Sequence, residues 1–306
     1  MNKKMNRTTI GLLAMIPCIL WASVFPVVKL LLEELSITTD TPGKITIAGM
    51  RFFTAGVIIL IYATIKNKDF PVPEKKAWGN ILLVGMFQTF GLYSLYYISM
   101  AFVTGVKASV ISQGGIFYLI ILAYFILDER VKRNQWIGIF FGILGIIAIN
   151  VNRISGDTNF FTFTFQGEGL LMLSGVFGSI GQILAKKRCT SVAPMTLNGW
   201  QMTLGGGVLL VFGIILNGGI VPLTSVFSIF LMLYSVMVAA VGFTVWYYLL
   251  QNVNVSEIVP FRLTIPVLGS MFSAIFLPGE NISVNIIVGL LFVLFGMYIT
   301  RLPDKI

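Results

Sequence analysis

Long apolar runs alternate with short polar segments along nearly the whole chain. A helix that crosses a bilayer needs about 20 mostly apolar residues, and ten runs approach that length. The pattern therefore predicts an all-α integral membrane protein with ten transmembrane helices. The expected bounds are 9–32, 45–65, 79–98, 104–127, 135–151, 167–186, 196–217, 227–250, 256–277 and 283–301.

Composition makes a lipid bilayer the expected surroundings of the chain. Hydrophobic residues make up 57% of the sequence and charged residues only 11%, whereas a soluble domain carries about 25% charged residues. The net charge of +9 fits nucleic acid or an acidic membrane surface. The basic residues stand in short clusters between the apolar runs, as in cytoplasmic loops, so we expect no nucleic-acid partner.

The distribution of lysine and arginine predicts the orientation. If the N-terminus is cytoplasmic, the inside segments carry 15 basic residues and the outside segments only four. This bias predicts that both termini face the cytoplasm and that the chain lies in the cell (inner or plasma) membrane. The outside four are Lys29, Lys44, Lys107 and Arg153, and Arg51 and Arg262 lie within expected spans.

The two halves of the sequence, 9–151 and 167–301, match each other. A constant offset of 151 residues relates Tyr96 to Tyr247, Glu129 to Glu280, Gly138 to Gly289 and Gly145 to Gly296. Several matches in order indicate an internal repeat. Because each half holds five expected spans, an odd number, the second half enters the membrane from the opposite side. We therefore predict two inverted five-helix repeats in one membrane domain, as in many secondary transporters.

Helix-disrupting residues mark where a central site is expected. Gly114–Gly115 falls in the fourth run, and Pro266 falls at the matching place in the ninth, while Pro17 and Pro26 lie in the first. Broken helices free backbone groups that line a cavity. The alternative is that glycine permits close helix packing and proline only bends the helix.

Two arginines within expected spans are the main charged candidates. Placing an arginine mid-membrane costs roughly 2.5–3.5 kcal/mol on insertion scales, so Arg51 and Arg262 are expected to face the helix bundle. Each either binds an anionic group of a substrate, which a guanidinium holds with two hydrogen bonds, or ties helices together. Glu257 begins the ninth run and is either a helix cap or a proton site. The absence of mid-span acidic residues favours facilitated exchange or uniport over proton coupling.

Polar and aromatic residues within the runs complete the expected substrate site. Aromatic faces suit planar solutes, and amides recognise the edges of such solutes. The alternatives are packing, interfacial anchoring and hydrogen bonds between helices. These candidates are Trp21, Ser23, Tyr93, Tyr97, Gln113, Gln182, Trp200, Gln201, Trp246 and Tyr247.

Several kinds of chemistry lack their residues. The chain has no histidine, which removes histidine-based triads, metal ligands and proton relays. No GxxxxGK[ST] loop for ATP occurs. Cys18 and Cys189 have neither a zinc-binding nor a redox spacing. We therefore expect no cofactor, no metal and no enzymatic activity.

Four segments resemble the EamA-type drug/metabolite transporter superfamily. They are WASVFPVVK at 21–29, AGMRF at 48–52, YYISMAFVTGVKAS at 96–109, and the ILDERV…W.G…G…G stretch from Ile126 to Gly145, which is the most specific. The likeness covers nearly the whole chain. It departs near Gly115, where the family's usual proline is missing, whereas Pro266 is kept in the second half.

The resemblance implies ten helices around a central cavity and movement of amino acids, nucleobases, vitamins such as riboflavin, or drugs. The predicted function is thus a secondary transporter that moves a small organic metabolite by alternating access, as a monomer or homodimer. A membrane-embedded lipid-modifying enzyme and a channel stay open as alternatives.

Overall fold

The computed structural model describes residues 6–103, 108, 111–156, 162–277 and 284–302. All regular secondary structure in these ranges is helical, which confirms the all-α prediction. The helices are α1 (Arg7–Glu34), α2 (Thr41–Asn67), α3 (Trp78–Gly85), α4 (Leu92–Ser99), α6 (Gly114–Leu127), α7 (Arg133–Gly156), α8 (Leu170–Arg188), α9 (Pro194–Asn217), α10 (Val226–Asn252), α11 (Val255–Ile258), α12 (Thr264–Phe276) and α13 (Val284–Arg301). Short non-α turns are η1 (Lys75–Ala77), η2 (Met86–Gly91), η3 (Phe165–Gly169) and η4 (Val259–Leu263).

Seven segments in the described ranges are long and apolar enough to cross a membrane. Three further apolar helices are shorter, namely Gly114–Leu127, Arg133–Ala148 and Val284–Thr300. They fall in the fourth, fifth and tenth expected runs. In the fourth run, the described helix is shorter than the expected span because it begins only at Gly114. Most of 104–110, including Lys107, lies outside the described residues. The count of ten spans stays a prediction.

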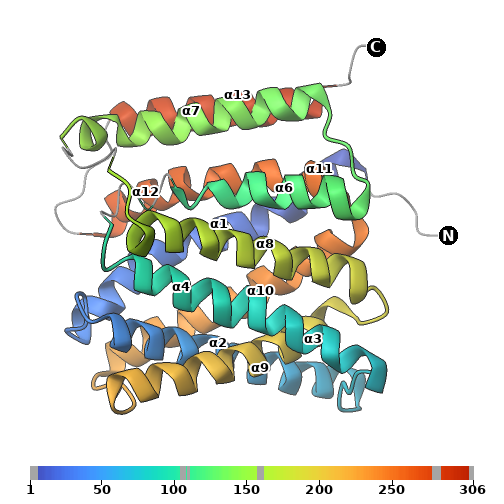
Figure 1. Cartoon of the computed structure of the whole chain (residues 1–306), viewed down its shortest axis with the longest axis vertical. Coiled ribbons are helices and arrows are strands. Elements are labelled where there is room, and N and C mark those ends of the chain that lie inside the picture. Colours follow the sequence, from blue (N-terminus) through green and yellow to red (C-terminus); the bar gives the residue numbers. More distant parts are fainter. Residues whose placement is uncertain (1–5, 104–107, 109–110, 157–161, 278–283, 303–306) are drawn as a thin grey trace.

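The helices lie side by side in layers, with both termini at one end of the molecule (Figure 1). We call this the termini end. The pair α7 and α13 forms one edge of the assembly, and the pair α2 and α9 forms the opposite edge. Between these pairs, α1 packs on α10 and α12, while α8 packs on α4 and α6. The connections α2–α3, α6–α7, α8–α9 and α10–α11 also lie at the termini end, so the basic clusters between the spans gather there.

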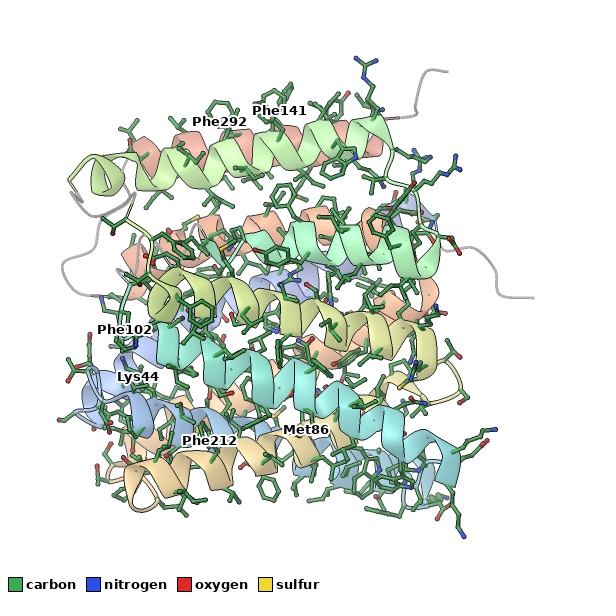
Figure 2. All side chains as sticks on the ribbon, viewed as in Figure 1. Lys44, Met86, Phe102, Phe141, Phe212 and Phe292 are labelled. Carbon is green, nitrogen blue, oxygen red and sulfur yellow. The ribbon has the colours of Figure 1, made fainter. Side chains whose placement is uncertain are left out.

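Glycines let the two edge pairs approach backbone to backbone. A methyl group added at Gly138 of α7 would lie 2.6 Å from the carbonyl oxygen of Gly296 in α13. One added at Gly206 of α9 would lie 2.5 Å from the backbone nitrogen of Phe53 in α2. Along the first pair, the rings of Phe141 and Phe292 stack with centroids 6.3 Å apart (Figure 2). Small residues at such contacts are the usual way in which membrane helices pack closely.

The helix breaks differ in part from those expected. Helix α1 runs unbroken through Pro17 and Pro26, so these prolines do not interrupt it. Helix α6 begins at Gly114, and the ninth expected span is interrupted at η4, which holds Pro260. Pro266 instead lies in the first turn of α12, where its missing N–H leaves no helical bond unmade. The π-helical turns η2 and η3 were not predicted.

Candidate functional site

Five aromatic side chains from four helices meet in the interior. This aromatic cluster consists of Trp21 on α1, Phe52 on α2, Tyr93 on α4, and Phe243 and Trp246 on α10. The Trp21 ring lies 4.9 Å from Phe243 and 5.6 Å from Trp246 between centroids. Phe52 lies 4.3 Å from Tyr93 and 6.4 Å from Phe243. The cluster thus joins helices from both halves of the chain.

Tyr97 on α4 and Tyr247 on α10 extend the cluster along these two helices. The Tyr97 ring lies 6.5 Å from Tyr93, and the Tyr247 ring lies 6.5 Å from Phe243. The structure therefore brings together five of the predicted aromatic residues, and it adds Phe52 and Phe243. Sequence reasoning missed these two because nothing in the sequence distinguishes them from the rest of the chain's 25 phenylalanines.

Arg51 lies beside this cluster with a partner. Its side chain is buried, and its Nε donates to the carbonyl oxygen of Ser235 on α10 at 3.1 Å. Its guanidinium carbon also lies 4.9 Å from the centre of the Phe52 ring. The bond joins α2 to α10, so it agrees with the structural reading of Arg51 as a tie between helices.

Arg262 reaches the cluster from η4, the break in the ninth expected span. Its guanidinium carbon lies 5.8 Å from the centre of the Trp246 ring. Its Nε is fully buried and has no hydrogen-bond partner within the described ranges. A buried N–H without a partner costs about 1–3 kcal/mol, and more when the group is charged. No described residue therefore offsets the cost of burying the Nε of Arg262.

Two further buried polar atoms, on side chains in or beside the aromatic cluster, have no partner among the described residues. The Nε1 of Trp21 and the hydroxyl of Tyr247 are buried, and neither makes a hydrogen bond to any residue that the structure describes. We call Trp21, Tyr247 and Arg262 the donor cluster. All three side chains belong to the aromatic cluster or contact it. Unpaired buried polar groups are rare in folded proteins, so three such atoms make this part of the interior the candidate binding site.

The predicted glutamines hydrogen-bond between helices instead. The Oε1 of Gln182 accepts from the Nε1 of Trp246 at 2.9 Å. The Oε1 of Gln201 accepts from the Thr89 hydroxyl at 2.7 Å, and its Nε2 donates to Asn198 at 3.1 Å. These contacts join α8 to α10 and η2 to α9. Both amides are thus used by the fold, as the interhelical alternative expected.

A family model described as "EamA-like transporter family" matches residues 8–151 and again residues 165–302. The chain belongs to the EamA-like transporter family. An "uncharacterized transporter" of Archaeoglobus fulgidus is 31% identical over 286 residues, which cover 91% of this chain and 94% of that protein. A "probable amino-acid metabolite efflux pump" of Salmonella typhimurium is 24% identical over 303 residues, covering 94% and 93%.

Further comparisons agree with this family and fold. A chloroplastic WAT1-related protein of Arabidopsis thaliana is 25% identical over 299 residues, covering 94% of this chain and 68% of that protein. One solved crystal structure superposes with a TM-score of 0.77 at 16% identity and covers 97% of both chains. The protein is therefore a multi-pass membrane protein of a transporter family.

Three of the predicted site residues of this EamA-like protein have contacts with residues outside the cluster. Trp200 donates through Nε1 to the carbonyl oxygen of Pro71 at 2.8 Å, and its ring packs on Phe70 and Trp78. Gln113 borders an apolar groove of about 300 Å³ beside α6 and α7. Ser23 bonds to the Leu20 carbonyl and the Tyr234 hydroxyl, at 2.8 Å each.

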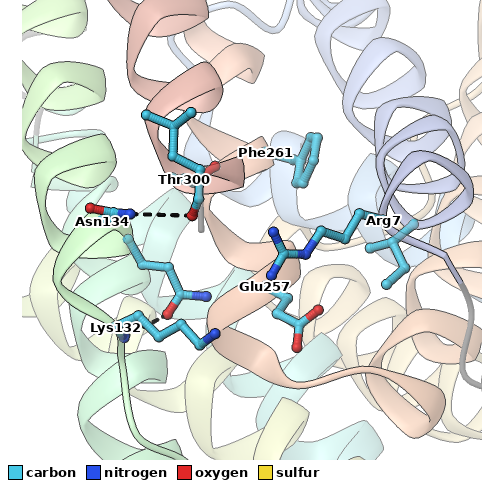
Figure 3. Close-up of a pocket in the computed structure, with 9 residues that line it drawn as sticks. Arg7, Lys132, Asn134, Glu257, Phe261 and Thr300 are labelled. Atoms are coloured by element: carbon cyan, nitrogen blue, oxygen red, sulfur yellow. Dashed lines mark hydrogen bonds between the residues drawn. The ribbon is translucent and has the colours of Figure 1, made fainter. Parts of the chain in front are cut away.

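Glu257 lies at the termini end rather than within the bundle. It lines a small cavity of about 110 Å³ together with Arg7 and Lys132, and Figure 3 shows its carboxylate near the Arg7 side chain. Its Oε1 accepts from the Nδ2 of Asn254 at 3.4 Å, and its side chain is exposed. Glu257 lies in the first turn of α11, whose N-cap residue is Asn254, so Glu257 is not itself the cap.

One glutamine that sequence reasoning missed lies near Gln182. The Oε1 of Gln88, in the wide turn η2, is buried and has no partner among the described residues. A methyl group added at Gly181 of α8 would touch the Gln88 backbone, at 2.8 Å from its nitrogen. Single π-helical turns within α-helices, such as η2, are frequent at functional sites. No group of three or more side chains able to hold a metal ion occurs among the described residues.

Proposed function

We propose that this protein is a secondary transporter that moves a small organic metabolite by alternating access. The donor cluster is the observation that carries the proposal, since the Nε of Arg262, the Nε1 of Trp21 and the hydroxyl of Tyr247 are buried and have no hydrogen-bond partner among the described residues. In a family of transporters, the missing acceptor is most simply a substrate. Membrane arginines of this kind mark substrate pathways by default.

The donor cluster defines the chemistry of the proposed substrate. A carboxylate offers about four acceptor sites and is a strong partner for a guanidinium. The surrounding rings of Trp21, Phe243 and Trp246 suit a flat apolar body. The proposed substrate is thus a small molecule with one anionic group and a planar or apolar part. The efflux-pump name of the Salmonella relative is compatible with this class.

We further propose that residues 9–151 and 167–301 are inverted repeats. The helix packing supports this arrangement. Helix α1 packs on α10 and α12, and its proposed counterpart α8 packs on α4 and α6, which are the counterparts of those two helices. The edge pairs α2–α9 and α7–α13 each join a helix to its own counterpart. A two-fold axis in the membrane plane generates such pairings, and exchange of the two conformations exposes one site to either side.

The acidic residues support exchange or uniport rather than proton coupling. Two buried or nearly buried carboxylates in the described ranges lie near span ends. Glu168 accepts from the backbone nitrogen of Thr164, and Glu129 pairs with Lys186. The basic residues gathered at the termini end support cytoplasmic termini in the cell membrane. A monomer or a homodimer is compatible with this design.

Flux into proteoliposomes tests the transport proposal against its rivals. A panel of labelled amino acids, nucleobases and flavins is first narrowed by thermal-shift screening of the purified protein. Saturable uptake that accelerates when the same solute is loaded inside supports a carrier. Ohmic, unsaturable flux would instead identify a channel, and formation of a new product would identify an enzyme. Glu74→Gln, which removes an exposed ion pair with Lys76, is the control variant.

A further inference from the structure

A nearly buried ion pair joins the segment after α6 to the last turn of α8, at the termini end. The Oε1 of Glu129 lies 2.9 Å from the Nζ of Lys186, and their side chains are only 10% and 14% exposed. Glu129 follows the end of α6, and Lys186 lies in the last turn of α8. By contrast, Glu74 and Lys76 form an ion pair with both side chains more than half exposed. The first pair is therefore desolvated, whereas the second is a surface pair.

Both partners also bind the start of the helix that carries Arg262. The Oε2 of Glu129 accepts from the backbone nitrogen of Val255 at 2.6 Å. The Nζ of Lys186 donates to the carbonyl oxygen of Val253 at 2.5 Å. We call Glu129, Lys186, Val253 and Val255 the latch. Val255 begins α11, which continues through η4 to Arg262.

The latch joins the two halves of the chain at one point. Glu129 belongs to the first family match, whereas Lys186 and Val255 belong to the second. A buried ion pair adds little net stability compared with apolar side chains of similar size, but removal of one partner is strongly destabilising. Such a pair is best suited to specify one arrangement of the groups around it. Here that arrangement holds α6, α8 and α11 together.

The opposite end has a weaker contact between the halves. There the Ser225 hydroxyl donates to Glu34 at 2.6 Å, and this contact is exposed to solvent. Water competes with exposed polar contacts and leaves them little net energy. Among the described residues, the Glu129–Lys186 pair is therefore better shielded from water than the Ser225–Glu34 contact.

We propose that the latch closes the termini end of the transporter and opens once in each transport cycle. This inference rests on the proposed transport function. Glu129 is then a positioning residue, because it fixes the first residues of the broken helix on which Arg262 is carried. Opening the latch frees α11 and η4 from α6 and α8, so a change at this end reaches the donor cluster.

The two native cysteines report on the latch without any substrate. Cys189 is fully buried three residues after Lys186, and Gln251 donates to its carbonyl oxygen at 3.1 Å. Burial raises the pKa of the Cys189 thiol to about 11, so the closed state reacts slowly with maleimides. Cys18 is buried in α1, where its thiol lies 3.4 Å from the carbonyl oxygen of Phe261. The proposed opening separates η4 from α6 and α8 but leaves it packed on α1, so Cys18 stays covered and its labelling measures global unfolding.

Labelling with N-ethylmaleimide in nanodiscs tests the proposal, with each cysteine followed by peptide mass spectrometry. Glu129→Gln should speed labelling of Cys189 by about tenfold or more, because the open state gains population. Cys18 should label much more slowly, and Glu74→Gln should behave as wild type. Lys186→Met should speed labelling of Cys189 to a similar extent, and the double variant Glu129→Gln with Lys186→Met should label little faster than either single variant, because both changes break the same ion pair.

Three results would overturn the latch. Cys189 in Glu129→Gln could label at the wild-type rate, both cysteines could become reactive together, or the effects of Glu129→Gln and Lys186→Met on the labelling rate could multiply in the double variant. The first denies that Glu129 restrains this end, the second indicates general unfolding, and the third denies a role for the ion pair. If the protein transports none of the tested solutes, the labelling results can still be interpreted, because the labelling requires no substrate.

Discussion

Arg51 and Arg262 lie beside the same aromatic cluster, yet their surroundings differ in one respect. Arg51 extends from the regular helix α2, and its Nε is bonded to the Ser235 carbonyl. Arg262 extends from the short turn η4, and its Nε has no partner in the described part of the chain. Arg51 is buried, and the Nε of Arg262 is buried although that residue is only partly buried as a whole. Burial alone therefore does not separate a structural arginine from a binding one. The hydrogen bonding of the Nε atom distinguishes the two side chains.

The difference assigns opposite energetic roles to the two side chains. A partnered arginine contributes to folding, because its loss removes a bond to a charged group. An unpartnered one costs folding energy, which is recovered only when an anion arrives. The cost is a hallmark of sites built for binding rather than for stability. The predictions below test this contrast, from the largest expected effect to the smallest.

Arg262→Ala should weaken binding of anionic substrates by about 10–100-fold, which corresponds to the roughly 1.5–3 kcal/mol of a hydrogen bond to a charged group. Neutral analogues should lose little affinity. The thermal midpoint of the unliganded protein should stay unchanged or rise, because a desolvated cation has been removed. Equilibrium binding of matched acid and amide ligands, with thermal unfolding in detergent, measures both effects. Equal losses for acid and amide would contradict the assignment.

Arg51→Ala should destabilise the protein by about 2 kcal/mol, since it removes the bond between α2 and α10. Acid and amide ligands should lose affinity equally, if at all. Thermal unfolding compared with wild type measures the first effect, and the binding assay used for Arg262 measures the second. An acid-selective loss for Arg51→Ala would reverse the roles of the two arginines.

Gln182→Leu should turn a partnered group into an unpartnered one beside Arg262. The Nε1 of Trp246 then loses its acceptor at 2.9 Å, which should cost about 1–2 kcal/mol of stability. Gln182→Glu keeps an acceptor there and is the matched control. If Gln182→Leu unfolds at the wild-type temperature, the bond between α8 and α10 contributes nothing measurable to stability.

The sequence predicts much of this architecture but not the roles of its polar residues. Apolar run lengths and the match between the halves indicate the helices and the family. They also single out Arg51 and Arg262 as unusual, because arginine within an apolar run is expensive wherever it lies. The partner of Arg51 is a backbone carbonyl 184 residues away, and every residue type has that group. No local pattern therefore reveals which arginine is bonded.

The helix break illustrates the same limit. Pro266 is a strong local signal, yet proline in the first helical turn is tolerated because no helical bond is lost there. The structure places the break at η4, one turn earlier, and leaves α1 unbroken despite two prolines. Neighbouring helices decide whether a proline ends a membrane helix. The position of Arg262 on a broken segment thus follows from tertiary packing and was not predictable.

Trp200→Phe sets the baseline for a polar group that is partnered and remote from both arginines. The change keeps the ring beside Trp78, at 4.6 Å between centroids in the native protein, and removes only the bond to the Pro71 carbonyl at 2.8 Å. Stability should fall by about 1 kcal/mol, the typical net value of a neutral hydrogen bond. Binding of acid and amide ligands should not change, because the donor cluster is untouched. An acid-selective loss in this variant would mean that such selectivity reports general loosening of the helices, and it would then no longer distinguish Arg262 from Arg51.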